Sequence, residues 1–288
     1  QGHHVTHAPP SKPYLTPSRF VIFAIVYFAI WCLAATFYFR HSVRQDAHRD
    51  FRTTQRLEWW SGLTMVAFGL TLTYAAFDFL MSLAPHWYST IFGVYVFAGC
   101  AMSGVATLLL IVLGLRSNLP DARFISIETQ RDLGRLMFAF VFFWAYIAFS
   151  QYMLLWYANV PETASWLVRR GMSTADGYRN SWGWLSLLLL FGHFVIPFLG
   201  IMSRHVKSNA RWMVYWCVWL LLMQYADLFW IVMPTWYERF SVRLVDIGVL
   251  AIVLGLAGWF VVAMTRYCKL IPVGDPRLIE SLQRESMY

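Results

Sequence analysis

Seven long apolar segments restrict what this sequence can fold into. Each reaches the roughly twenty residues that a helix needs to cross about 30 Å of hydrocarbon. Because lipid offers the backbone no hydrogen-bond partner, a segment of this length must satisfy its own peptide groups as a helix. The segments are approximately 20–39, 59–83, 89–115, 133–159, 181–203, 210–233 and 244–267. The sequence therefore predicts an all-α polytopic membrane protein with seven transmembrane helices.

The composition agrees with this prediction. Hydrophobic residues make up 59% of the 288 residues and charged residues only 13%, against about 25% charged in soluble domains. Basic loops beside anionic headgroups explain the net charge of +8, so we expect no nucleic-acid partner. The four cysteines are scattered and form no Cys-x-x-Cys pair. We therefore expect this chain to hold no iron–sulfur cluster, zinc ion or c-type haem.

Lysine and arginine predict the orientation in the membrane. The loops at 40–58, 116–135 and 204–211, together with the tail from Arg266, hold sixteen of the 23 basic residues. These segments all lie on one side if the seven spans alternate in direction. By the positive-inside rule, the C-terminus is expected to be cytoplasmic and Gln1 to lie on the outer, periplasmic side.

An internal repeat extends this topology. The pattern Asp-x6-Pro-x-Trp-Tyr occurs from Asp78 and again from Asp227, 149 residues later, near the ends of the second and sixth spans. Spans that are four apart run in the same direction, which is typical of a parallel repeat with a four-helix unit. The first unit would retain only two helices here, so we expect further spans before Gln1. Three such spans would give a ten-helix protein made of two four-helix bundles.

This interpretation divides the chain into five parts. They are an outer-side loop (1–19), the last two helices of the first bundle (20–83), the second four-helix bundle (84–233), a final transmembrane helix (234–267) and a cytoplasmic tail (268–288).

Acidic residues within the apolar segments are the first candidates for function. Asp78 shares one helical face with Thr64, Thr71, Tyr74 and Ser82, and a polar stripe in a membrane helix must face protein or water. A charged aspartate at this depth costs about 3 kcal/mol, so it should be protonated or paired. Both states suit a proton path, although a hydrogen bond that merely ties two helices together would explain the residue equally well.

The fifth and sixth spans repeat this logic. Gln224 and Asp227 are three residues apart and therefore lie on one helix face. His193 lies near the middle of its span, and Pro197, four residues later, frees a backbone carbonyl because proline has no N–H donor. We interpret His193 as a proton-transfer or quinone-contact residue; the alternative is a buried histidine bonded to a neighbour.

The fourth span contributes more polar groups to the same side of the membrane. Ser150, Gln151 and Asn159 approach the outer face, on the same side as both aspartates. We therefore predict a proton path made of Asp78, Asp227, His193, Tyr74, Gln224, Gln151, Ser150 and Tyr146. Glutamine and serine between helices are also commonly structural, so that alternative stays open.

Three stretches carry a resemblance to a known family. Residues 77–95 (Phe77-Asp78-Phe-Leu-Met-Ser82…), 143–162 (…Ser150-Gln151-Tyr152…Asn159-Val-Pro161-Glu162) and Gly274-Asp275-Pro276-Arg277 resemble the NrfD-like membrane subunits of bacterial alternative complex III, in particular the ActF-like branch. The resemblance implies ten spans in two four-helix bundles and a place in the bacterial inner membrane. It also implies partners: a paralogous NrfD-like subunit, an iron–sulfur subunit, c-type cytochrome subunits and small membrane subunits.

The implied function is that of an integral subunit of a quinol:cytochrome c, or quinol:terminal oxidase, oxidoreductase. ActF-like subunits are thought to supply a proton path and a scaffold rather than a redox centre, so no covalently bound cofactor is expected and the chain is not expected to be catalytic alone. Quinone and membrane lipids are the ligands that this resemblance suggests. Three alternatives remain: a purely structural anchor, a quinone-binding subunit and a secondary transporter. Against the transporter, the sequence shows no helix broken mid-membrane by paired glycine and proline.

Overall fold

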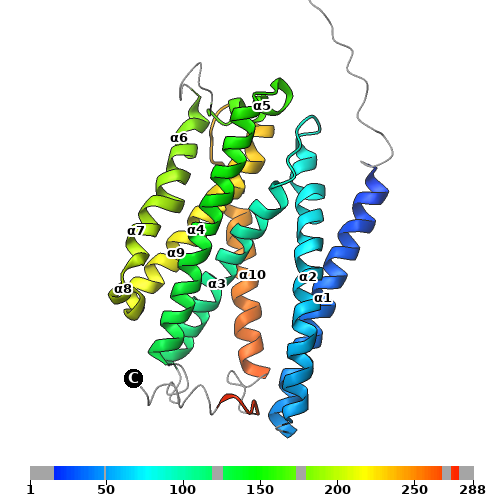
Figure 1. Ribbon diagram of the computed structural model, residues 1–288, viewed down its shortest axis with the longest axis vertical. Coiled ribbons are helices and arrows are strands. Elements are labelled where there is room, and N and C mark those ends of the chain that lie inside the picture. The colour runs from blue at the N-terminus through cyan, green and yellow to red at the C-terminus, as the bar shows by residue number, and fades with distance from the viewer. Residues whose placement is uncertain (1–15, 49, 119–125, 173–179, 268–273, 279–288) are drawn as a thin grey trace, which may run out of the picture.

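The computed structural model describes residues 16–48, 50–118, 126–172, 180–267 and 274–278. Within these residues every regular element is a helix, and seven helical spans are long and apolar enough to cross a membrane (Figure 1). The spans are α1 (Pro17–His48), α2 (Phe51–Phe79), α3 (Phe92–Asn118), α4 (Ile127–Ala158), the continuous span of α6 (Ser181–Leu188), η3 (Leu189–Val195) and α7 (Ile196–Met202), α9 (Ala210–Val232) and α10 (Leu244–Tyr267). The predicted all-α polytopic fold is confirmed.

Short helices distinguish the two ends of the bundle. One end carries α5 (Pro161–Arg169) and two 3-10 turns, η1 (Met81–Leu83) and η4 (Met233–Thr235), which follow α2 and α9. We call it the aspartate end, because Asp78 and Asp227 lie near the C-termini of α2 and α9. The other, here called the basic end, holds α8 (Arg204–Ser208), the α1–α2 connection and the start of α4 (Figure 1).

The helices extend further than the apolar segments alone predicted. The predicted loop at 40–58 is wrong in extent, because α1 continues to His48 and α2 begins at Phe51. Polar residues lengthen a helix beyond the hydrocarbon once its first turn is capped, and the Asp50 carboxylate accepts a hydrogen bond from Arg52 N at 3.0 Å. Ser126, Asn180 and Asn209 cap the starts of α4, α6 and α9 in the same way.

Two buried clusters hold α3, α4, the α6–α7 span and α9 together. The cluster at the aspartate end is aromatic, with Trp144, Trp166, Trp182 and Trp230 among its members. The cluster toward the basic end is built from smaller and more flexible side chains such as Met102, Leu109, Met137, Met213 and Leu220. The helices therefore pack along most of their length.

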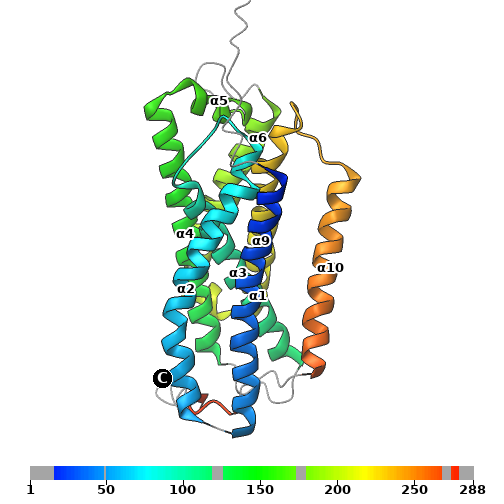
Figure 2. The same ribbon diagram turned by 90° about the vertical axis from the view of Figure 1, so that its right-hand side faces the viewer.

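The remaining spans are attached more loosely. In Figure 2, α10 stands apart from the other helices, and none of its central residues is buried, while only 6% of the central stretch of α1 is buried. After α10, the short segment 274–278 returns to the α1–α2 connection, where Gly274 N donates to Asp46 Oδ1 at 3.1 Å and Arg277 pairs with Glu58. Residues 1–15 of the predicted outer loop and most of the predicted tail lie outside the described residues, and the last residues of that loop belong to α1, which begins at Pro17. The ten-helix repeat and the five-part division stay predictions.

Candidate functional site

A fully buried carboxyl group is the centre of the candidate site. Asp227 of α9 has no exposed surface, and its Oδ1 accepts a hydrogen bond from the hydroxyl of Tyr95 on α3. The second oxygen, Oδ2, has no hydrogen-bond partner among the described residues. The pair joins two spans and leaves one carboxyl oxygen free to exchange a proton.

Two more side chains surround this pair. The Trp144 indole lies near Asp227 and Tyr95 without completing a hydrogen bond, and its ring centroid is 3.9 Å from that of His193. His193 is fully buried, and neither ring nitrogen has a hydrogen-bond partner among the described residues. Four groups from α3, α4, η3 and α9 therefore meet at one place, and two of them, Asp227 and His193, were predicted.

The backbone around His193 departs from a regular α-helix. Leu189–Val195 forms a π-helix, in which Ile196 N bonds Phe191 O five residues back. The same register would pair residue 197 with Gly192 O, but Pro197 has no N–H. Trp219 Nε1 of α9 donates to Gly192 O instead, at 2.7 Å. The carbonyl that Pro197 leaves without a backbone donor is therefore that of Gly192, one residue earlier than in a regular α-helix. The neighbouring helix α9 supplies its donor.

A cavity of about 620 Å³ opens beside the buried pair. Its lining includes Tyr95, Trp144, Gln151, Trp166, Ser186 and Trp230, and the remaining lining residues are mainly apolar. This volume lies within the range of about 300–1,000 Å³ that is typical of sites for small organic ligands. Two of the lining residues hold buried polar atoms without partners among the described residues, namely Gln151 Oε1 and Trp144 Nε1.

A buried arginine closes the aspartate end of this region. Arg170 is only 2% exposed, and its guanidinium donates to Trp230 O (3.1 Å), Ile231 O (2.6 Å) and Trp166 O (3.0 Å). It also lies 3.6 Å from the ring centroid of Trp166. Burial lowers the pKa of Arg170 to about 9, so the side chain keeps its positive charge at pH 7.

Proline again explains why a side chain is needed there. The carbonyl of Trp230 would normally accept from residue 234, but Pro234 cannot donate. Arg170 donates to the Trp230 carbonyl in place of Pro234, and it also donates to the next carbonyl, that of Ile231. Because Trp166 and Trp230 both line the cavity, Arg170 fixes the position of two of its walls.

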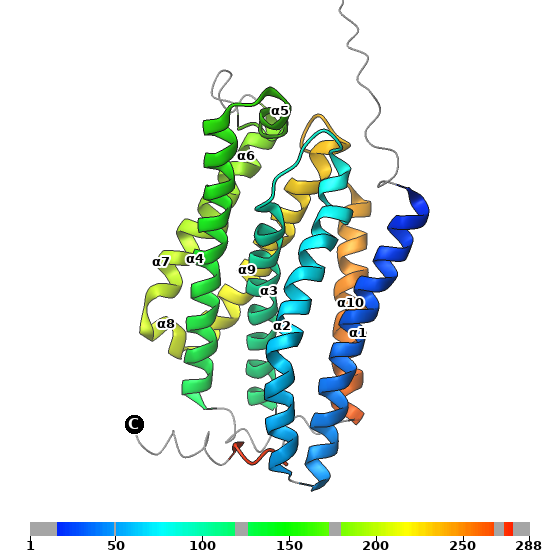
Figure 3. The same ribbon diagram turned by 45° about the vertical axis from the view of Figure 1, so that its right-hand side comes forward.

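The other predicted aspartate belongs to a different helix pair. Asp78 is 5% exposed and accepts a hydrogen bond from Tyr27 of α1 at 2.6 Å. Trp31–Thr71 (2.9 Å) and Tyr38–Thr64 (3.0 Å) form two more such bonds between α1 and α2, which run side by side in Figure 3. Thr64, Thr71 and Asp78 of the predicted polar stripe therefore face protein, as expected, and their seven-residue spacing keeps them on the α1 seam. Tyr74 of the same stripe does not, because its side chain is exposed.

The remaining predicted residues divide into inward and outward positions. Gln151 and Gln224 are buried, the latter against Gly99 of α3, where an added Cβ would lie 2.6 Å from Gln224 Nε2. Ser150 is half-buried. Tyr74 and Tyr146 are 53% and 59% exposed on the outer surface of the helices. Gln151 thus lines the cavity, and Asp227 and His193 lie behind its lining residues Tyr95 and Trp144. Tyr74 and Tyr146 lie on the outer surface instead.

Sequence reasoning missed four residues of these sites: Tyr27, Tyr95, Trp144 and Arg170. Pro234 could have indicated a residue such as Arg170, because a proline at this position leaves the Trp230 carbonyl without its helical donor. The chain matches no protein-family model and no curated protein. Its description therefore rests on its own residues and geometry. They indicate an all-helical integral membrane protein with a buried acid beside an apolar cavity.

Proposed function

We propose that this chain is an integral membrane subunit of a quinol-oxidising complex, which passes electrons to a cytochrome c or a terminal oxidase through its partner subunits. Its own part is a proton path and a scaffold. The observation that supports this most is the fully buried Asp227–Tyr95 pair beside a 620 Å³ cavity. Acidic groups inside a membrane protein are costly and characteristically mark proton or ion pathways.

The chemistry follows from the groups that meet there. Oxidation of a quinol releases two protons along with two electrons, and a nearby group must accept each proton. Asp227 Oδ2 is buried and has no hydrogen-bond partner among the described residues, so it has an unused site for a proton. The Tyr95 hydroxyl, which lines the cavity and bonds Asp227 Oδ1, can pass a proton because it both donates and accepts. His193 packs against Trp144, and neither of its ring nitrogens has a partner among the described residues. Asp78 and Tyr27 form a separate acid–hydroxyl pair between α1 and α2.

The first test removes one titratable oxygen. Asp227→Asn keeps the shape of the side chain and an acceptor for Tyr95 but cannot carry a proton. In the assembled complex, reconstituted into vesicles, we expect fewer protons released per electron while electron transfer persists. Asp50→Asn is the matched control, because Asp50 is exposed and asparagine also caps helices. Unchanged proton release in Asp227→Asn would refute the proton-path function.

The same substitution tests the structural-anchor alternative. If Asp227 only ties α9 to α3, its replacement should change assembly or melting temperature and leave proton release per electron unchanged. A matching Tyr95→Phe variant removes the hydroxyl that bonds Asp227. A path through this hydroxyl predicts fewer protons released per electron, whereas a tie between α3 and α9 predicts only lower stability.

The cavity favours one second candidate, a quinone-binding role. An aromatic-lined space with unused donor and acceptor atoms at Trp144 and Gln151 suits a ring with two carbonyl oxygens. A short-chain quinone should then quench the tryptophan fluorescence of the purified protein. Gln151→Leu should weaken this quenching, and Gln45→Leu, which alters a glutamine outside the cavity at the basic end, should not.

A further inference from the structure

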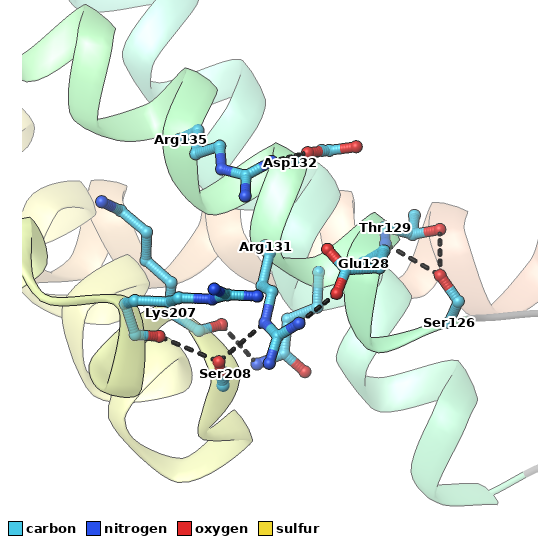
Figure 4. A network of polar contacts seen from close by, with 10 residues as sticks. Ser126, Glu128, Thr129, Arg131, Asp132, Arg135, Lys207 and Ser208 are labelled. Carbon is cyan, nitrogen blue, oxygen red and sulfur yellow. Dashed lines mark hydrogen bonds and ion pairs between the residues drawn. The ribbon is translucent and has the colours of Figure 1, made fainter. Parts of the chain in front are cut away.

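The basic end carries a charge cluster that the proton path does not use. Its positive members in the described residues 116–118, 126–135 and 204–211 are Arg116, Arg131, Arg135, Arg204, Lys207 and Arg211, whereas only Glu128 and Asp132 are acidic there. This leaves a net charge of +4 at one end of α3, α4, α8 and α9. Figure 4 shows part of the cluster, where α4 meets α8.

Hydrogen bonds fix the shape of this cluster. Gln130 Nε2 donates to Lys207 O at 2.8 Å, and Arg131 Nε donates to Ser208 Oγ at 2.8 Å (Figure 4). The short helix α8 is therefore attached to the first turns of α4. Arg131 also pairs with Glu128, and Arg135 pairs with Asp132 at 2.5 Å. The second pair is exposed, so water screens it strongly and it can rearrange at little cost.

Lys207 carries a positive charge with no acidic partner among the described residues. Its Nζ donates to the carbonyl of Met202 at 3.1 Å and lies 4.7 Å from the ring centroid of Phe138. Partial burial, together with the nearby charge of Arg135, lowers the pKa of Lys207. An anion between Lys207 and Arg135 would compensate both charges.

An apolar seam begins directly beneath these charges. Phe138 of α4 stacks on Phe198 of α7 with ring centroids 5.1 Å apart, and Phe142 lies one turn deeper, 6.2 Å from Phe198. Phe142 and Leu199 are 54% and 61% exposed. A positively charged rim above a lipid-facing aromatic seam matches the two parts of a phospholipid, an anionic head and an acyl chain.

We propose that the seam between α4 and α7–α8 binds an anionic diacyl phospholipid, with its phosphate between Arg135 and Lys207 and one acyl chain along Phe138, Phe198 and Phe142. Arg131 and Arg204 lie at the same end and add attraction for the head. The charge of the cluster argues against a zwitterionic lipid, whose head carries its own cation. The aromatic seam argues against a free phosphate ion, which would gain nothing from it.

The test is native mass spectrometry of the full chain, purified in detergent with any co-purifying subunits and titrated with dioleoylphosphatidylglycerol or dioleoylphosphatidylcholine. We expect one phosphatidylglycerol to be retained in preference to phosphatidylcholine. Each basic side chain near an anionic surface contributes about a factor of five. Arg135→Gln with Lys207→Gln should therefore weaken retention roughly thirtyfold.

Controls keep the result decisive. Arg239→Gln with Arg243→Gln removes the same charge from exposed positions at the aspartate end and should leave retention unchanged. Lys207→Arg keeps the charge and should bind as the wild type does. If the double variant does not fold, Arg135→Gln alone, at an exposed side chain, should still weaken retention about fivefold. Equal retention of both lipids, unchanged retention in the Gln variants, or displacement by excess inorganic phosphate would each overturn the proposal.

Discussion

Replacing Arg170 by lysine tests whether the fork of the guanidinium, rather than its charge, holds the aspartate end together. The arginine serves three carbonyl oxygens from three different atoms, at 2.6–3.1 Å. A lysine ammonium donates from a single atom and cannot reach all three. With one carbonyl satisfied, two stay buried without a donor, at about 1–3 kcal/mol each. We therefore expect Arg170→Lys to lower the free energy of unfolding by about 2–6 kcal/mol.

The measurement is thermal unfolding of the purified chain in detergent. On the scale of soluble domains, each kcal/mol corresponds to about 2–4 °C for a chain of this order of size, so the melting temperature should fall by at least about 4 °C. Arg169→Lys is the matched control, because the neighbouring Arg169 is exposed and surface substitutions usually stay within about 0.5 kcal/mol. A lysine variant that melts with the wild type would show that charge alone suffices and would refute the carbonyl argument.

The pH dependence of this difference has a definite sign. The pKa of Arg170, about 9 in the folded protein, is lower than the ordinary value of 12.5. Between pH of about 9 and 12.5, Arg170 is protonated in the unfolded chain and neutral in the folded chain. Only in that range does Arg170 make the free energy of unfolding rise with pH. Below that range both states are protonated. The difference in stability between wild type and Arg170→Met should stay constant from about pH 6 to 8, and a slope there would contradict the assigned charge state.

Two further substitutions test the packing that surrounds the site. Gly200→Ala should destabilise the protein by about 1–3 kcal/mol, because the added Cβ would lie 2.0 Å from Cζ2 of Trp216; Gly258→Ala, with open space around it, should leave the melting temperature nearly unchanged. Trp219→Phe should cost about 1–3 kcal/mol by leaving the Gly192 carbonyl without its donor, and wild-type stability in that variant would show that water satisfies the carbonyl.

The sequence predicts the parts of this molecule that follow from single-helix rules. Seven apolar segments of sufficient length identify the seven spans. The seven-residue spacing of Thr64, Thr71 and Asp78 identifies the face of α2 that meets protein. Pro197 identifies a place where the backbone needs help from outside its own helix. Each of these inferences depends only on periodicity, length or a missing donor.

The partners in these contacts depend on how helices cross, which one-dimensional patterns do not encode. Phe, Tyr and Trp make up 18% of the chain, so aromatic character alone does not single out Tyr95 or Trp144. Polarity also misled at Tyr74 and Tyr146, whose hydroxyls suggested inward positions although both side chains lie on the outer surface. Arg170 was hidden for another reason: it stands in a polar stretch between spans, where arginine normally remains in water.

The carbonyl of Gly192 also bears on how the chain enters the membrane. Its donor, Trp219, lies in the next span, which leaves the ribosome after Ser181–Met202. Until that span arrives, one peptide oxygen of η3 has no donor from its own helix, and an orphan group in hydrocarbon is costly. We therefore expect these two spans to insert together as a hairpin.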